Sequence, residues 1–268
     1  MPETREYAAL SDTELVSLLF TEEDRLPRAA VDEILRRGVP VAPHLTRILD
    51  DDASWTLESP REWAPVHASY LLAAMQPPGA LDVMIRALEK ADRHAIRWIT
   101  NPMPSLLAAF GPPAVDTLLR EVSNRSREDW VRISLLEALH HLGADDGPSR
   151  DRIVDLFRSM ASDASEPRPI RKWAALELLG FAAPGDRELL LSLAGGGAFE
   201  IMYNVDDVER ALRGEERPRK ADRDWLKFYD TDEIADRRRR WEDPARPATR
   251  DLKDVLDRNA SSDILGDL

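Results

Sequence analysis

The chain has 268 residues, of which 43% are hydrophobic, and its formal net charge is −13. This apolar content is ample for a buried core, so composition excludes a chain that is disordered throughout. The absence of cysteine excludes disulfides, thiolate metal sites and a cysteine nucleophile.

The sequence predicts neither a membrane span nor a secretory signal. No run approaches the ~18 apolar residues that mark a membrane-spanning helix. The N-terminus is polar and acidic, without the basic and apolar regions of a secretory signal. We therefore expect a cytoplasmic protein that does not associate with membranes.

Most of the negative charge lies in the first four fifths of the chain. Residues 1–218 hold 25 Lys+Arg and 37 Asp+Glu, whereas residues 219–268 hold 12 and 13. An acidic surface repels phosphate backbones and attracts basic partners. This distribution predicts a basic protein partner and makes nucleic-acid binding unfavourable.

The first predicted element is an N-terminal helix within residues 1–25, capped by Ser11 or Asp12 and ending near Phe20. A helical hairpin follows between Leu26 and Asp52. Gly38 separates its two apolar-periodic runs and is placed to end the first helix in the left-handed conformation that glycine adopts without steric cost.

Two longer hairpins then repeat almost the same pattern. Residues 63–88 and 98–122 align at an offset of 35 positions, so that Trp63 falls on Trp98 and Pro77-Pro78 falls on Pro112-Pro113. Each copy has an apolar-periodic run, a Pro-containing break and a second run. A fixed period of this length is typical of stacked helical repeats.

Two further hairpins complete an array over residues 26–194. The first helices of the five hairpins are expected to end at Gly38, Gln76, Gly111, Gly143 and Gly180. Residues 195–214 are predicted to form a charged terminal capping segment, as repeat arrays require. Residues 215–268 have almost no apolar stripe and predict a charged, partly disordered tail with short helices at Asp232–Trp241 and Asp251–Arg258.

The hairpin length, the Pro or Gly break and the Leu/Ala-rich helices resemble HEAT-like repeats, in particular the short bacterial kind of the phycobilisome lyases. The resemblance covers about Leu26 to Ala194. It implies an all-α fold, a right-handed α-solenoid of about five HEAT-like helical hairpins. It also implies a scaffold for protein recognition, since most members of that family serve in this way.

The tryptophans allow two interpretations. Trp63, Trp98, Trp130 and Trp173 each lie near the start of a first helix. They form either an aromatic strip that grips a ligand or wedges that pack between hairpins, and repetition favours the wedges. The adjacent His140 and His141 point about 100° apart on a helix and are expected to be interfacial rather than metal-binding.

No motif predicts catalysis. The spacing of the histidines, the glycine triplet at 195–197 and the scattered acids match no metal site, phosphate loop or acid/base pair. We therefore predict no catalytic residue, no metal and no cofactor.

Two clusters are the candidate partner-binding residues. One is the acidic run after the second predicted helix of the first hairpin, and the other is a basic-aromatic run in the tail. They comprise Asp50, Asp51 and Asp52, and Arg237, Arg238, Arg239, Arg240 and Trp241.

These features predict a non-enzymatic scaffold for protein–protein interaction, with an acidic curved surface that receives a basic protein or peptide. A specific version is an inhibitor or immunity-type role against a basic nuclease or toxin. The alternatives are a HEAT-like DNA glycosylase or another enzyme acting on nucleic acid, and a small-molecule enzyme like the phycobilin lyases.

Overall fold

A computed structural model describes residues 7–94, 96–145, 147–195 and 203–242. The chain divides into two compact units, of which the first ends at Trp225 and the second begins at Leu226. Within the described ranges the regular elements are α-helices and short 3-10 helices, without a strand. The all-α class predicted from the sequence is confirmed.

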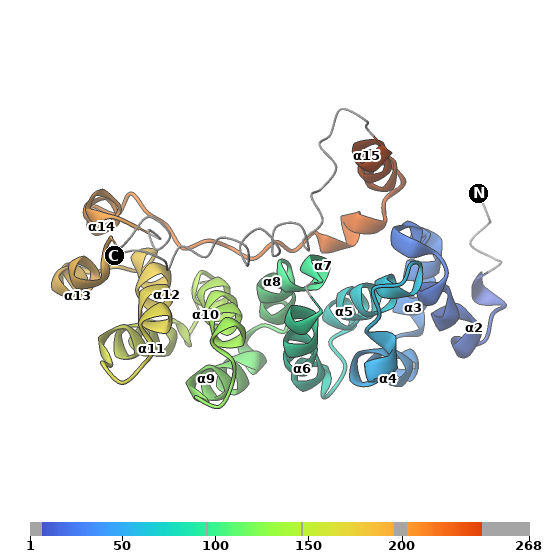
Figure 1. Cartoon of the computed structure of the whole chain (residues 1–268), viewed down its shortest axis with the longest axis horizontal. Helices are drawn as coiled ribbons and strands as arrows, with labels where there is room; N and C mark the ends of the chain where they lie inside the picture. The colour runs from blue at the N-terminus through green and yellow to red at the C-terminus, as the bar shows by residue number, and fades with distance from the viewer. Residues whose placement is uncertain (1–6, 95, 146, 196–202, 243–268) are drawn as a thin grey trace, which may run out of the picture. The chain divides into compact units, whose positions relative to one another are not determined.

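The helices of the first unit follow one another in two rows (Figure 1). Its helices are α2 (Asp12–Ser17), α3 (Arg28–Arg37), α4 (Ala42–Asp50), α5 (Ala64–Met75), α6 (Ala80–Arg93), α7 (Arg97–Thr100), α8 (Met103–Ala108), α9 (Val115–Ser123), α10 (Asp129–Gly143), α11 (Arg150–Ser162), α12 (Arg168–Leu179), α13 (Arg187–Leu193) and α14 (Val205–Leu212).

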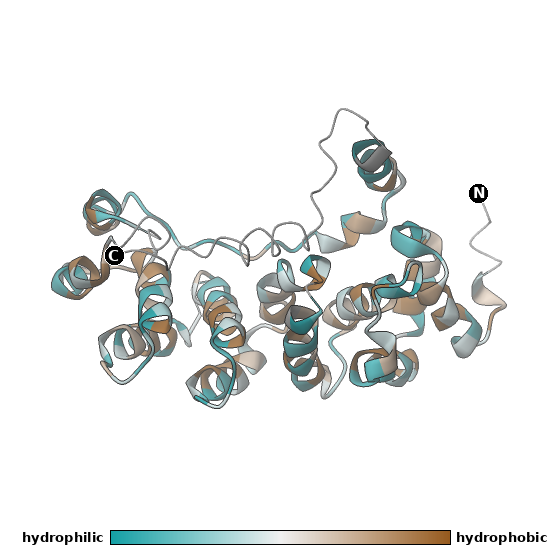
Figure 2. Ribbon diagram, viewed as in Figure 1, coloured by the Kyte–Doolittle hydropathy of each residue, from teal (hydrophilic) through white to brown (hydrophobic). Residues whose placement is uncertain are grey.

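Each row is held by contacts between neighbouring helices. Helices α5, α8, α10 and α12 pack in sequence along one row, and α4 contacts α6 in the other. The rows meet where α4 packs on α5, α9 on α10 and α11 on α12. Buried leucines such as Leu71, Leu106 and Leu135 fill the space between them, while polar residues occupy the outer sides (Figure 2).

The predicted Ser11 cap of the N-terminal helix is confirmed, and Gly38 ends the first helix of the first hairpin. Ser11 caps α2 in a capping box with Glu14, in which the Ser11 hydroxyl accepts from the Glu14 amide and the Ser11 amide donates to the Glu14 carboxylate. Gly38 has a φ of 67°, as predicted, but a ψ of −136°, which is outside the left-handed helical region. The chain therefore leaves α3 in an extended direction before α4.

The long first helix expected after Trp98 is instead divided into α7 and α8. Pro102 and Pro104 interrupt it, because a proline has no N–H to donate to the carbonyl four residues earlier. Pro102 thus leaves the carbonyl oxygen of Trp98 without its helical donor. The hydroxyl of Tyr70, from the preceding hairpin, donates to that oxygen at 3.2 Å. The carbonyl group that the break leaves without a helical donor is therefore hydrogen-bonded by the neighbouring hairpin.

Loss of this hydrogen bond is expected to destabilise the first unit. Tyr70→Phe should lower the free energy of unfolding by about 1–2 kcal/mol, because the carbonyl of Trp98 loses a donor. Urea denaturation followed by circular dichroism measures the change.

Pro102→Ala provides the control, since it restores an amide that can donate to Trp98. In that background Tyr70→Phe should cost less than in the wild type. An equal cost in both backgrounds would show that the carbonyl does not depend on Tyr70.

The described residues that follow the hairpins, as far as Trp225, belong to the first unit and do not form a separate tail. Helix α14 lies within the predicted capping segment and packs on α12 and α13. The next residues, 215–224, contain no helix but belong to the first unit, which continues to Trp225. The sequence placed these residues in the tail, because their charged side chains gave no apolar stripe.

The second unit contains one described α-helix, α15 (Thr231–Glu242), which is one residue longer at each end than the helix predicted there. Within this unit Arg237 donates to the carbonyl oxygen of Phe228 at 2.8 Å, and its guanidinium carbon lies 3.7 Å from the centre of the Phe228 ring. The second predicted helix of the tail, Asp251–Arg258, lies outside the described residues.

Candidate functional site

The acidic run at the end of α4 is engaged in interactions with α6. The Asp50 carboxylate accepts from the Arg86 guanidinium at 2.9 Å. Lys90 donates to the carbonyl oxygen of Asp50 at 2.6 Å and pairs with the Asp52 carboxylate at 2.7 Å. Two of the three predicted partner-binding acids therefore connect neighbouring helices.

A second ion pair at the same separation supports this structural role. Asp50 and Arg86 are 36 residues apart, and so are Asp116 and Arg152, which join α9 to α11 at 2.7 Å. The apolar period is visible in the sequence, whereas this charged one is not, because the two members of each pair lie in different hairpins.

These exposed pairs are expected to contribute little to stability. Asp50→Asn should lower the free energy of unfolding by no more than about 1 kcal/mol, because exposed ion pairs are screened by water and salt. Thermal denaturation at low and high salt measures this loss of stability.

Asp116→Asn is the matched control, since it removes the equivalent pair. The two variants should lose similar stability, and high salt should reduce both losses. A loss well above 1 kcal/mol for Asp50→Asn alone would assign that carboxylate a further structural role.

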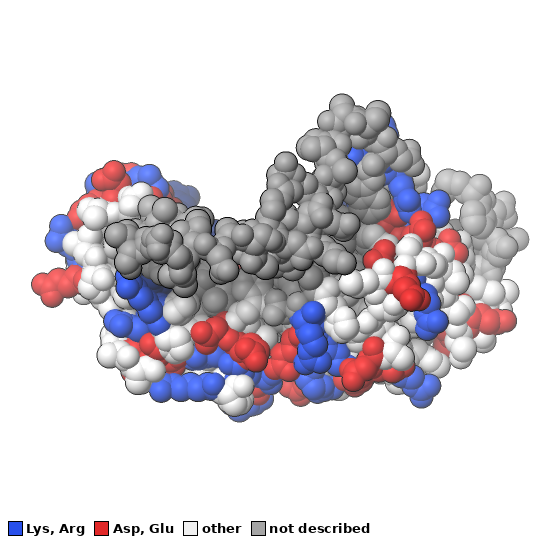
Figure 3. Space-filling view, in the orientation of Figure 1, with Lys and Arg blue, Asp and Glu red and all other residues white. Residues whose placement is uncertain are grey.

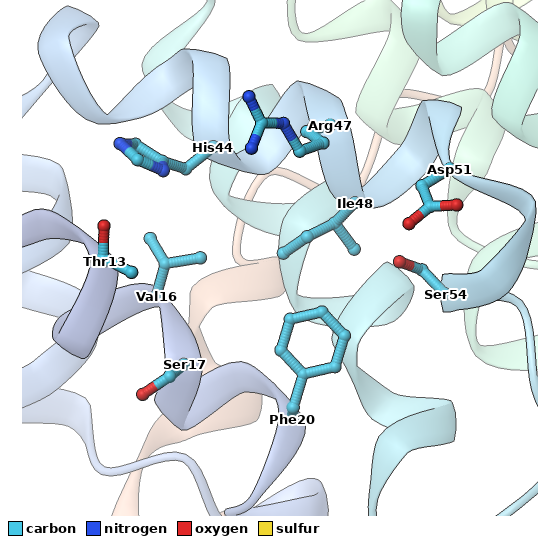
Figure 4. Close-up of a pocket in the computed structure, with 9 residues that line it drawn as sticks. All are labelled: Thr13, Val16, Ser17, Phe20, His44, Arg47, Ile48, Asp51 and Ser54. Atoms are coloured by element: carbon cyan, nitrogen blue, oxygen red, sulfur yellow. The ribbon is translucent and has the colours of Figure 1, made fainter.

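Asp51 has a different environment. Its carboxylate accepts from the amide of Ala53 at 3.0 Å, and among the described residues no lysine or arginine pairs with it. Asp51 lies at the rim of a hollow of about 220 Å³ between α2 and α4 (Figure 4). It is therefore the acid of the run that remains available to a cationic group.

The hollow has an apolar floor and a polar rim. Val16, Phe20 and Ile48 form the floor, with the Phe20 ring directed toward Ile48 (Figure 4). The rim consists of Thr13, Ser17, His44, Arg47, Asp51 and Ser54. No sequence pattern predicted this site, because its lining combines residues 13–20 with residues 44–54, which belong to separate elements.

A second depression lies on the other side of α4. It has a volume of about 620 Å³, and Val39, Pro43 and Pro78 supply much of its apolar lining. Asp50 lines this second depression and Asp51 lines the hollow, while Arg47 contributes to both. The exposed side of α4 thus presents two depressions, each with one acid of the predicted run.

The charge on the face of the molecule drawn in Figure 3 is mixed. On the face drawn in Figure 3, Lys and Arg side chains lie among Asp and Glu side chains rather than apart from them. The net acidity of the first unit therefore does not appear there as one acidic patch.

The predicted basic-aromatic run lies on α15 in the second unit. Arg237 is buried and bonded to Phe228, whereas Arg239 pairs with Asp236 one turn away. Arg238 and Arg240 also have partners. The side chain of Trp241 lies outside the described part of the chain. The arginines of this run thus differ in environment and do not form one uniform surface.

The tryptophans follow neither interpretation uniformly. Trp63 is buried, and its ring centre lies 5.7 Å from that of Trp98 in the next hairpin, as expected for a wedge between hairpins. Trp98 and Trp130 are each 40% exposed, and Trp173 is half-buried. Repetition of a residue type therefore did not guarantee the same burial in each hairpin.

The described residues contain no group of three or more His, Asp or Glu side chains arranged to hold a metal ion. None of the described helices has both the length and the apolar character needed to cross a membrane.

Residues 12–176 match the family described as "Protein of unknown function (DUF1186)". The chain belongs to this family. The match covers α2 to α11 and most of α12, and so includes the hollow beside α4. No curated protein and no solved structure matches the chain.

Proposed function

We propose that this DUF1186 protein is a non-enzymatic scaffold that binds a basic protein or peptide, and that its first unit is a right-handed α-solenoid of HEAT-like hairpins. The two rows of helices and the ion pairs at a separation of 36 residues support the repeat architecture. So do Arg132 and Arg171, which donate to carbonyl oxygens ten residues earlier at the ends of α9 and α11.

The observation that carries the proposal is the hollow between α2 and α4. An apolar pocket surrounded by polar groups is the usual receptor for a single anchoring side chain of a protein partner. The volume of about 220 Å³ suits one large apolar side chain. Asp51 at the rim is placed to receive a lysine or arginine next to that anchor.

The overall charge supports the same class of partner. The excess of acids over bases in residues 1–218 accelerates encounters with a basic protein and disfavours nucleic acid. The inhibitor or immunity-type role in the cytoplasm is the specific form of this proposal, in which the partner is a basic nuclease or toxin.

Selection from a random peptide library with the full chain as bait tests the proposal. We expect enriched peptides to carry a large apolar residue beside Lys or Arg. For such a peptide, Asp51→Asn should weaken binding about tenfold, because one charge-assisted contact is lost. The asparagine retains an oxygen that accepts from Ala53, so the turn is preserved.

Asp129→Asn is the control, since it removes one exposed carboxylate from the first turn of α10, away from the hollow. This variant should bind the peptide like the wild type. Equal weakening in both variants would show that only the net charge matters and not the position of Asp51. A library without enriched peptides would contradict the proposal.

A further inference from the structure

Residues 215–225 run as an extended strap along the first helices of the hairpins. The strap begins after α14, crosses α12, α10 and α8, and ends near α5 (Figure 1). Residues 215–224 contain no helix, so their conformation depends on the helices that they contact. This arrangement is that of a bound peptide, with the peptide supplied by the chain itself.

The main contact surrounds the fully buried carboxylate of Glu177 on α12. Arg219 of the strap donates to both carboxylate oxygens, at 3.0 and 2.8 Å. His140 Nδ1 lies 2.9 Å from one of them. Burial alone would raise the pKa of Glu177, but His140 and Arg219 outweigh it and lower that pKa. A buried carboxylate needs such partners, so this position selects a basic residue in the strap.

Side chains of the array also bind the strap backbone. The Arg219 amide donates to His140 Nε2 at 2.8 Å, so the ring proton of His140 is on Nδ1, facing Glu177. His141 Nδ1 donates to the Arg219 carbonyl oxygen at 2.9 Å. The Asp222 amide donates to the Ser105 hydroxyl at 3.1 Å. Contacts to backbone groups can be made by other sequences too.

Three further contacts set the register of the strap. Arg223 pairs with Asp145 after α10, and the Trp225 indole donates to the carbonyl oxygen of Tyr70 on α5 at 3.3 Å. At the other end, a Cβ on Gly180 would lie 3.0 Å from Pro218 Cα. Glycine there lets the strap approach α12 closely without a shift of either segment. The recognised pattern is thus Pro-Arg, a second arginine four residues later, and an aromatic residue.

The strap is attached in a way that permits exchange. The Arg219 side chain is 54% exposed, whereas Glu177 is inaccessible to solvent. Arg219 therefore approaches its acid from outside, and leaving requires no opening of the helical core. Arg223 and Asp145 are both solvent-exposed, so this ion pair is individually weak.

We propose that the face formed by α5, α8, α10 and α12 is a binding groove for an extended Pro-Arg peptide of another protein, and that residues 217–225 occupy it until that peptide displaces them. Glu137, on α10, adds a second carboxylate 3.9 Å from Arg219. The acidic groups select a basic peptide, and the tethered strap sets a threshold affinity that a partner must exceed. This groove is separate from the hollow beside α4.

A labelled synthetic peptide with the sequence of residues 215–225 tests this proposal by fluorescence anisotropy. With the wild-type chain its binding should be weak, because the tethered strap competes at high effective concentration. A full chain carrying Arg219→Ala and Arg223→Ala should bind the same peptide about tenfold more tightly or better. Adding Glu177→Gln to that chain should remove the gain.

The matched control is the full chain with Arg217→Ala and Lys220→Ala, which removes two exposed strap charges that pair with no acid among the described residues. It should bind the peptide like the wild type. Should the first double variant not fold, Arg223→Ala alone, which changes an exposed pair, is expected to give a smaller gain in the same direction.

Equal binding by the wild-type chain and the Arg219→Ala, Arg223→Ala chain, or binding by neither, would overturn the proposal. So would a wild-type dimer that is lost with Arg219→Ala in sedimentation experiments, because the occupant would then be the strap of a second copy. Asp51→Asn should leave peptide binding in this groove unchanged. A failure of the groove proposal can therefore be distinguished from a failure of the proposal that the hollow beside α4 binds a partner.

Discussion

The first unit depends on apolar helix faces that no single hairpin can bury. A helix such as α10 buries almost its whole surface, because it contacts α8, α9, α11 and α12. Stacking is therefore the source of stability, and each hairpin is completed by its neighbours. The polar contacts between hairpins, including the bond from Tyr70 to Trp98, act at places where stacking alone would leave a backbone group unsatisfied.

The same dependence explains why acids acquired different roles. Asp50 lies between neighbouring helices of one row and serves stacking, whereas Asp51, one residue later, faces a hollow and remains available. Glu177 lies inside the opposite row, where a carboxylate needs a cation, and the chain supplies Arg219 from 42 residues later. Position relative to the stack, rather than the local sequence, decides whether an acid is structural or free to bind.

The sequence predicted the features that depend on local patterns. The all-α class, the Ser11 cap and the helix that became α15 follow from spacing and capping rules. It missed the strap, because residues 215–225 carry the charge expected of a solvated tail and their partners lie up to 155 residues away. It also missed the hollow, whose lining comes from separate elements of the chain. Gly180 was predicted only to end a helix. Its φ of −62° is ordinary, and its small size instead makes room for Pro218 of the strap.

The most direct test of this account is hydrogen–deuterium exchange of the strap in the wild-type chain. The amides of Arg219 and Asp222 donate to His140 and Ser105, so they should exchange more slowly than an unstructured segment of the same sequence. Protection at these two amides would show that the strap occupies the groove in solution. Exchange at the rate of a free peptide would contradict both the bound strap and the groove inferred from it.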